Sequence, residues 1–369
     1  VSTQSTGTIK MTELALKIWY GNQLYDLETD SEEPVETLAI QIQSITSLEP
    51  QFQILMVENY HLPLDLSKQI SFYQIPQNAT VVVLGSNVIA ADPQQKMSEV
   101  QIKRLETLQA AGHPIGIINP KNMCYCISAI QYLASSKKIC SHVRKQPEGA
   151  LVTPIKNLFA KLEEKTDANT QFSIFLKYFI QTHAEFANLM EQHDSQEALA
   201  ALIGDLKLQE MFELQTTGQQ LQFLPLNIKQ EFTNVGESIQ YFLKEEKILK
   251  LPKLLQLQFI RYSFDEQLKK AQKISRKLGF TMQMNLNDFL AEGVDKLNYK
   301  LKAVIAHQGT SVSNGHYVCF IRQGRKWFCM NDSIVQYVEE EQVLQLAGGD
   351  AVGFLSYVCM YQAEEEGKE

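Results

Sequence analysis

The spacing of apolar residues changes partway along this chain of 369 residues. From about residue 112 to about residue 206 they recur every three or four positions, as in 172–179, which is the period of an amphipathic helix. Beyond about residue 249 apolar and polar positions alternate, as in 255–259, which is typical of strands. A run of helices followed by a run of strands limits this part of the chain to an α+β fold.

Residues 13–86 predict a smaller α+β unit of their own. Pro34 follows two acidic residues and is typical of a helix start, and Val35, Leu38 and Ile42 continue at helical spacing. Strands are expected at 14–20, 23–27, 54–57 and 81–84, with a hairpin turn at Gly21 and Asn22 between the first two. The order ββαβ…β is that of the β-grasp, or ubiquitin-like, fold.

Two domains joined by a linker are therefore expected. Residues 13–86 make the first domain, residues 87–111 the linker, and residues 112–363 the second domain. The linker starts with small and polar residues around Pro93, a composition common between domains, and then becomes a short helix pattern.

Charge and composition exclude several function classes. The formal net charge of −8 argues against general binding to nucleic acid, which favours a basic face. No apolar run reaches the roughly 18 residues that span a bilayer, and the start of the chain shows no secretory signal. We expect neither nucleic acid nor a membrane as a partner.

The six cysteines are too sparse for a disulfide scaffold. None stands in a Cys-x-x-Cys pair, so we expect no metal, and we expect no other cofactor. Such a chain suits a reducing cytosolic or nuclear compartment. Five of the cysteines are expected to be buried small apolar residues: Cys126, Cys140, Cys319, Cys329 and Cys359.

The sixth cysteine stands where a nucleophile would. Cys124 precedes a predicted helix at 125–133, so its sulfur would face the positive end of that helix. A helix N-terminus and a neighbouring imidazolium both lower the pKa of a thiol. His316 follows Gly315, which permits close approach of a substrate backbone. A cysteine opening a helix with a distant histidine is typical of a papain-like thiol protease.

Three more residues complete the predicted catalytic set. The histidine takes the thiol proton and returns it to the leaving amine, so another group must hold its second ring nitrogen. Asn331 is the first candidate for that role and Asp332 is the second. Asn119, on the loop before the cysteine, can donate to the oxyanion of the intermediate.

Both neighbourhoods resemble the signature boxes of the ubiquitin-specific proteases, a family of papain-like deubiquitinases. The cysteine box agrees at Gly116, Asn119, Asn122, Cys124, Tyr125, Ser128, Gln131 and Leu133. The histidine box agrees at Tyr299, Leu301, Val304, His307, Gly309, Gly315, His316, Tyr317, Trp327, Asp332, Ser333, Val335, Tyr357 and Tyr361. Between the boxes, 192–197 resembles the family's Gln-x-Asp-x-x-Glu element and 251–262 resembles its Leu-Pro…Leu-x-Arg-Phe strand.

The resemblance implies an α+β fold in which a β-grasp ubiquitin-like domain precedes a papain-like ubiquitin-specific protease catalytic domain. It assigns Cys124 as nucleophile, His316 as base, Asn331 as its orienting group and Asn119 as oxyanion donor. For substrate binding it points to Gln192, Asp194, Glu197, Gly315 and Tyr317. Asp194 and Glu197 would contact the extended ubiquitin tail, although a solvated helix surface is the alternative interpretation of that pair.

The domain order resembles the proteasome-associated branch of the family. That resemblance implies ubiquitin and ubiquitinated proteins as substrates, and docking of the ubiquitin-like domain on the proteasome regulatory particle. The loop from Gln308 to Gly315 resembles loops that block the cleft until docking or substrate arrives.

The sequence also departs from the family pattern. Lys121 replaces a glycine close to the nucleophile, Ile127 replaces an asparagine, and the third catalytic position holds Asn331 where an aspartate is common. An amide can orient the ring but cannot stabilise an imidazolium by charge, so we expect an active enzyme of low intrinsic activity. The alternatives to a deubiquitinase are therefore a weakly active or inactive proteasome-bound regulator that binds ubiquitin, and an enzyme that processes another ubiquitin-like modifier.

Overall fold

The computed structural model describes residues 13–20, 23–46, 48, 50, 53–57, 64, 66, 68–84, 112–189, 191–265, 270–311, 314–348 and 353–364. The chain divides into two compact units, Val1–Ile102 with Asn169–Met190 and Lys103–Ala168 with Glu191–Glu369. The predicted hairpin turn at Gly21 and Asn22 and the predicted linker at 87–111 lie outside the described residues.

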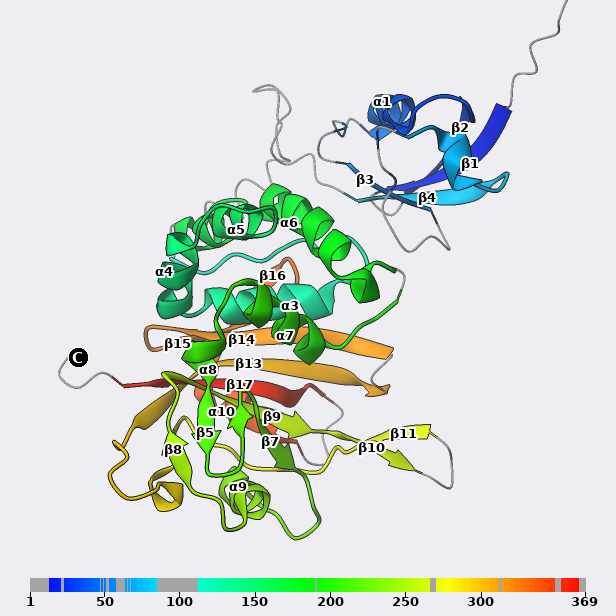
Figure 1. Ribbon diagram of the computed structural model, residues 1–369. Coiled ribbons are helices and arrows are strands. Elements are labelled where there is room, and N and C mark those ends of the chain that lie inside the picture. The colour runs from blue at the N-terminus through cyan, green and yellow to red at the C-terminus, as the bar shows by residue number, and fades with distance from the viewer. Residues whose placement is uncertain are drawn as a thin grey trace, which may run out of the picture. The chain divides into compact units, whose positions relative to one another are not determined.

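The first unit contains a four-stranded sheet with the order β2-β1-β4-β3. Its elements are β1 (Glu13–Tyr20), β2 (Gln23–Asp30), α1 (Val35–Thr46), β3 (Ile54–Val57), η2 (Ile70–Tyr73) and β4 (Ala79–Leu84). β1 is antiparallel to β2 and parallel to β4, and α1 buries Val35, Leu38 and Ile42 in the core of this sheet. The predicted strands and helix of this region are thus confirmed (Figure 1).

The same unit includes α6 (Asn169–Thr182) and the short η3 (Ala184–Phe186). Here the predicted aromatic stripe is confirmed, because Phe175 stacks on Phe179 with ring centroids 5.4 Å apart. Phe179 also stacks on Phe186, at 5.2 Å.

The second unit is built around a mixed sheet of eight strands (Figure 1). Seven strands follow the order β16 (Ile334–Val338), β15 (Lys326–Asn331), β14 (Asn314–Gln323), β13 (Asn298–Ser311), β17 (Leu355–Ala363), β9 (Leu254–Ile260) and β7 (Leu224–Asn227). The eighth, β12 (Gln283–Asn285), pairs with β13. Every pairing is antiparallel except that between β7 and β9.

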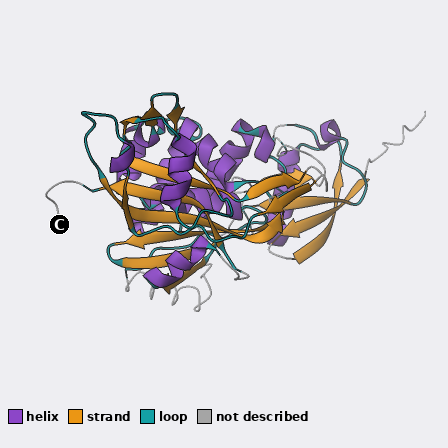
Figure 2. Ribbon diagram, turned by 90° about the horizontal axis from the view of Figure 1, so that it is seen from below, coloured by secondary structure: helices purple, strands orange, loops and turns teal. Residues whose placement is uncertain are grey.

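Helices cover both faces of this sheet (Figure 2). On one side α3 (Cys124–Ala134) packs on β14 and on α7 (Ser195–Asp205), with α4 (Lys137–Lys145) and α5 (Val152–Glu164) beside it. On the other side α9 (Val235–Leu243) packs on β7. Among the described residues no helix is long and apolar enough to cross a membrane.

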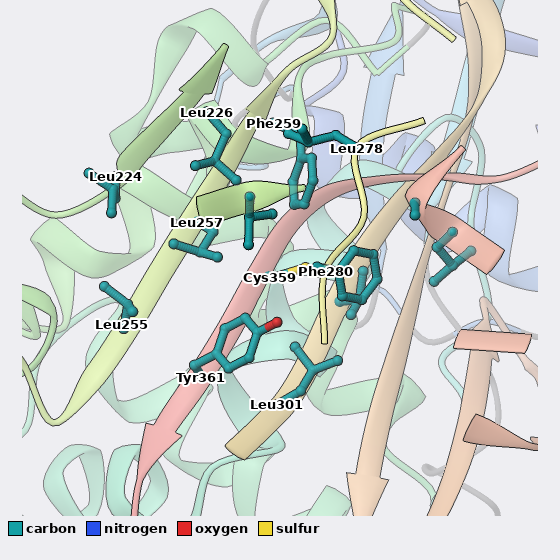
Figure 3. Close-up of a cluster of buried hydrophobic side chains, with 14 of the residues drawn as sticks. Leu224, Leu226, Leu255, Leu257, Phe259, Leu278, Phe280, Leu301, Cys359 and Tyr361 are labelled. Atoms are coloured by element: carbon teal, nitrogen blue, oxygen red, sulfur yellow. The ribbon is translucent and has the colours of Figure 1, made fainter. Parts of the chain in front are cut away.

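Alternate residues of the central strands pack into separate layers of the core, because successive side chains of a strand point to opposite faces. Val304 and Ala306 of β13 belong to the apolar cluster that includes α9, part of which is drawn in Figure 3. Their neighbours Ala303 and Ile305 are also fully buried, and α3 contacts this strand. Burial on both faces explains why the sequence in the middle of these strands is a nearly continuous run of apolar residues.

Smaller elements complete the second unit. They are α8 (Gln209–Phe212), β5 (Leu214–Thr216), β6 (Gln220–Leu221), β8 (Ile248–Lys250), β10 (Tyr262–Asp265), β11 (Lys270–Lys273), η4 (Asn287–Phe289), α10 (Glu340–Leu344) and η5 (Gln345–Ala347). The strands β10 and β11 pair with each other in an antiparallel ribbon.

Arg261, at the end of the predicted 251–262 strand, is buried and donates every guanidinium proton to backbone carbonyls or to the Ser356 hydroxyl. Nε donates to the carbonyl of Ser356 at 2.7 Å, and Nη2 donates to the carbonyl of Ala347 at 2.8 Å and to the Ser356 hydroxyl. Nη1 donates to the carbonyls of Ile274 and Arg276. One side chain thus connects β17, η5 and the segment after β11.

Replacing this side chain should destabilise the second unit. In Arg261→Met two buried and two partly buried carbonyls lose their donor, so we expect the free energy of unfolding to fall by about 3 kcal/mol. Urea denaturation measures the loss. Arg325→Met, which changes an exposed arginine, is the control and should cost less than about 0.5 kcal/mol. Equal losses in the two variants would contradict this account of Arg261.

Candidate active site

The loop before α3 is folded tightly by the side chain of Asn119. Its Oδ1 accepts hydrogen bonds from the backbone N–H groups of Lys121 at 3.1 Å and Met123 at 3.0 Å. Gln131 of α3 reaches back and donates to the carbonyl of Ile115 at 3.0 Å. These bonds hold the loop that leads into α3. Cys124 is the first residue of that helix, so the Cys124 sulfur lies at the positive end of the helix. Lys121 is accommodated with a negative φ.

A second loop, between β15 and β16, packs against the first. The carbonyl of Asp332 accepts from the N–H of Ile117 at 2.9 Å, and Asp332 itself adopts a left-handed φ of 51°. Gly116 lies so close that a Cβ there would be 2.3 Å from that carbonyl oxygen. Only glycine allows this approach, which explains why this position of the motif is a glycine.

His316 on β14 lies between these two loops. Its Nε2 is 2.7 Å from Oδ1 of Asn331 and 4.0 Å from Oδ2 of Asp332. Asp332 Oδ2 instead accepts a hydrogen bond from Nδ2 of Asn119 at 3.0 Å. Asn331 therefore holds the histidine ring directly, whereas Asp332 connects the histidine loop to the loop before Cys124.

The imidazole of His316 is paired with the Cys124 side chain. A hydrogen bond with Cys124 is the main cause that raises the pKa of His316 to about 9, with smaller contributions from Asn331 and Asp332, while burial acts in the opposite direction. A pKa above neutrality means that this histidine is an imidazolium at pH 7. The pair therefore has the electrostatics of an activated nucleophile.

The other five cysteines are buried, as the sequence predicts. Burial raises the pKa of Cys140 to about 12 and that of Cys329 to about 11, and it raises those of Cys126, Cys319 and Cys359 as well. These thiols remain protonated at neutral pH. Among the described residues, no group of His, Cys, Asp and Glu side chains could hold a metal ion.

The residues predicted to bind substrate lie on β14 and at or just before the start of α7. The side-chain oxygen of Gln192 accepts from the backbone N–H of Gly315 at 2.6 Å. Asp194 caps α7 by accepting from the N–H of Gln196 at 2.7 Å and also accepts from the Tyr357 hydroxyl, and burial raises the pKa of its carboxyl. Glu197 lies exposed in the first turn of α7.

Tyr317 is 3% exposed, with its ring 4.5 Å from that of His307. His307 is fully buried and belongs to a polar cluster that the sequence alone did not assign a role. Tyr262 and Lys273 approach its Nδ1 at 3.0 and 3.1 Å. The signal was present, because His307 and Gly309 both match the histidine box, but the partner Lys273 comes from β11, a strand that periodicity did not predict.

Comparisons with known proteins show which family this chain matches. A profile of the family described as "Ubiquitin carboxyl-terminal hydrolase" matches residues 115–361. The chain is similar to "Ubiquitin carboxyl-terminal hydrolase 6" of Schizosaccharomyces pombe, with 22% identity over 96% of this chain and 99% of the relative. It is also similar to "Ubiquitin carboxyl-terminal hydrolase 14" of Caenorhabditis elegans, with 22% identity over 94% of this chain and 93% of the relative.

The fold is similar to that of solved structures. A SAGA DUB module that contains Ubp8 and is bound to monoubiquitin matches with a TM-score of 0.58 and 20% identity, covering 68% of this chain and 69% of that chain. The same kind of module bound to ubiquitin aldehyde matches with a TM-score of 0.57 at 20% identity, over 68% of this chain and 70% of that chain. At this identity the match shows a shared fold.

The protonation state of His316 gives a direct test of the site. We expect a carbon-13 NMR titration of the histidine rings to show His316 losing its proton near pH 9. In Cys124→Ala the midpoint should fall toward the ordinary value of about 6.5, because the largest cause of the shift has been removed. Comparison with His316→Gln assigns the signal, and an unchanged midpoint in Cys124→Ala would contradict the pairing.

Proposed function

Because the chain belongs to the ubiquitin carboxyl-terminal hydrolase family, whose members are cysteine-type ubiquitin hydrolases, we propose that it cleaves the isopeptide bond between the ubiquitin C-terminus and a substrate lysine. The observation that carries this proposal is the chain of contacts from Cys124 through His316 to Asn331. A helix-terminal cysteine paired with an oriented imidazolium has the chemistry of a thiol hydrolase.

The reaction follows from these groups. The Cys124 thiolate attacks the carbonyl carbon of the terminal glycine of ubiquitin, and the resulting oxyanion collapses as His316 gives its proton to the leaving lysine amine. This step leaves ubiquitin joined to Cys124 as a thioester. Neutral His316 then takes a proton from water, which attacks the thioester and releases ubiquitin with a free C-terminus while Cys124 leaves as thiolate. Asn331 keeps the ring oriented in both steps.

Asn119 is suited to the oxyanion role and is held in place for it. A side-chain amide nitrogen carries two protons, and one of them is directed at Asp332. The side-chain carbonyl oxygen of Asn119 is fixed by two backbone N–H groups, so the amide plane cannot rotate freely. We assign the second proton to the oxyanion, and we assign Asp332 to holding Asn119 rather than to orienting His316.

The substrate tail is proposed to run past the Gln192–Gly315 contact. Gln192, Asp194 and the backbone of Tyr317 would line its path beside His316, and the exposed Glu197 would contact the tail from the first turn of α7. The capping bond and the Tyr357 contact fix the Asp194 carboxylate before any substrate arrives, and a fixed acceptor is the kind that gives binding specificity.

The N-terminal region at 13–86 is proposed to be a ubiquitin-like domain that docks on the proteasome regulatory particle, in the cytosol or the nucleus. Among the described residues of this region, four strands and the α-helix α1 follow the order ββαββ, which supports this proposal. Exposed apolar residues Leu24, Ile40 and Phe72 give it surface that a protein partner could cover. The two relatives align with nearly the whole chain, this region included.

Labelling by ubiquitin that carries a C-terminal electrophile tests the proposed activity. We expect a covalent adduct on Cys124 in the wild type, with or without added proteasomes, and none in Cys124→Ala, because only this thiol is paired with an imidazolium. Peptide mass spectrometry identifies the modified residue.

Other outcomes of this labelling would decide against the proposal. Binding to proteasomes with no adduct and no hydrolysis would identify a ubiquitin-binding regulator. Labelling by a different ubiquitin-like modifier, in preference to ubiquitin, would identify a protease of another substrate class.

A further inference from the structure

Lys273, the last residue of β11, makes three contacts with one short stretch of β13. Its ammonium nitrogen lies 2.9 Å from the carbonyl oxygen of Gly309, 3.1 Å from that of His307 and 3.1 Å from Nδ1 of the His307 ring. A protonated lysine has three N–H donors and no acceptor. Each of the three ammonium protons of Lys273 therefore has an acceptor, and these contacts hold the long, flexible side chain in place.

These carbonyls need a donor because the sheet ends beside them. The pairing of β13 with β17 stops at His307, opposite Leu355. The carbonyl of Gln308 faces the other edge, since a Cβ on Gly315 of β14 would be 2.3 Å from it. Carbonyls alternate in direction along a strand, so those of His307 and Gly309 face the side where β17 has ended. Lys273 supplies the hydrogen bonds that a continuing strand would have made.

The His307 ring is part of the same arrangement. Tyr262 and Lys273 both approach Nδ1, so this nitrogen is the acceptor and the ring proton is assigned to Nε2. Burial, together with the charges of Lys273 and His316, lowers the pKa of His307 to about 3, which keeps the ring neutral. A neutral ring at this position can accept from an ammonium ion, whereas an imidazolium would repel it.

The stretch held by Lys273 is the direct neighbour of the catalytic base. Gln308 pairs with His316 across β13 and β14, and the register of that ladder shifts immediately afterwards, between Gln308 and Ser311. The end of β13 thus supports His316 where regular pairing stops. A backbone displacement of about 1 Å near a reacting group can cost on the order of 100-fold in rate.

We propose that Lys273 is a positioning residue for the hydrolysis reaction, whose ammonium holds the end of β13 and thereby keeps His316 aligned with Cys124. This inference rests on the proposed hydrolase function. It assigns a role in the reaction to the β10–β11 ribbon, whose strands carry none of the catalytic or substrate-binding residues proposed above.

The protonation of Lys273 gives this role a pH dependence. Burial is the main cause that lowers the pKa of Lys273 to about 8, and the nearby charge of Arg261 acts in the same direction. Among the described residues, the ionisable groups around this ammonium and the His307 ring include Arg261, Tyr262, neutral His307, Tyr317 and, beyond the ring, His316. As pH rises through 8, the lysine loses its charge and keeps two protons for three acceptors, so its hold on the end of β13 weakens.

Two variants of Lys273 separate its charge from its packing. Lys273→Met keeps the aliphatic stem and removes all three donors, so we expect kcat for a fluorogenic ubiquitin conjugate to fall about 10-fold while KM changes less than about twofold. Lys273→Arg keeps a cation with several donors and should retain more of kcat than the methionine variant. Lys277→Met, which changes an exposed lysine four positions further on, should match the wild type.

The alkaline side of the pH profile distinguishes positioning from simple stabilisation. In the wild type, kcat should fall with an apparent pKa of about 8, as Lys273 loses its proton. Arginine stays charged in this range, so in Lys273→Arg the fall should move to about 9, where His316 loses its proton. An unshifted alkaline limb, or an unchanged kcat in Lys273→Met, would overturn the inference while the hydrolase function would stand.

Hydrogen exchange followed by mass spectrometry supplies a readout that does not depend on hydrolysis. In Lys273→Met, the peptide containing His307 and His316 should exchange faster than in the wild type, while peptides of α3 should be unchanged. The same rate in both proteins would overturn the inference even in the absence of hydrolysis. A global increase, with loss of cooperative thermal unfolding, would mean that Lys273 stabilises the whole fold, and this would also overturn the positioning role.

Discussion

The packing of α3 against β14 is the constraint on which the rest of the structure depends. It brings together a cysteine and a histidine that are almost 200 residues apart in the sequence. Ten of the eleven residues of α3 are buried, so the helix cannot slide or rotate without exposing apolar surface. The Cys124 sulfur is therefore fixed at a helix N-terminus, opposite an imidazole that Asn331 holds from behind. A site assembled this way needs little rearrangement to react.

The loop before Cys124 and the end of β13 are both shaped by polar side chains that face the protein instead of the solvent. Asn119 folds the loop before Cys124 and also donates to Asp332, so one amide connects the two loops. Lys273 performs the equivalent task at the end of β13. In each case the side chain takes the place of missing secondary structure, because Asn119 accepts from backbone N–H groups and Lys273 donates to backbone carbonyls. The catalytic geometry is thus supported by hydrogen bonds from side chains other than those of Cys124 and His316.

The sequence predicted the main elements of the fold because their apolar periods are strong. The α3 helix after Cys124, the stripe of α6 and the strand β9 lie where spacing and composition predicted them, and β13, β14, β15 and β17 lie in the part beyond about residue 249 that was predicted to form strands. The β10–β11 ribbon and β16 were missed, since they are short and carry little alternation. The helix α9 was missed although Asn234 and Glu237 form a capping box, a pattern that was available in the sequence. Asp332's bond to Asn119 could not be predicted, because it depends on how two loops meet.

The central claim is that Cys124 and His316 form a reactive pair, and the rate of thiol alkylation tests it most directly. At pH 7, with iodoacetamide and peptide mass spectrometry, the account predicts that Cys124 is modified faster than the five other buried cysteines. It also predicts that His316→Ala slows the modification of Cys124 by about 10-fold or more. Equal rates in the wild type and His316→Ala, or faster modification of another cysteine, would contradict the account.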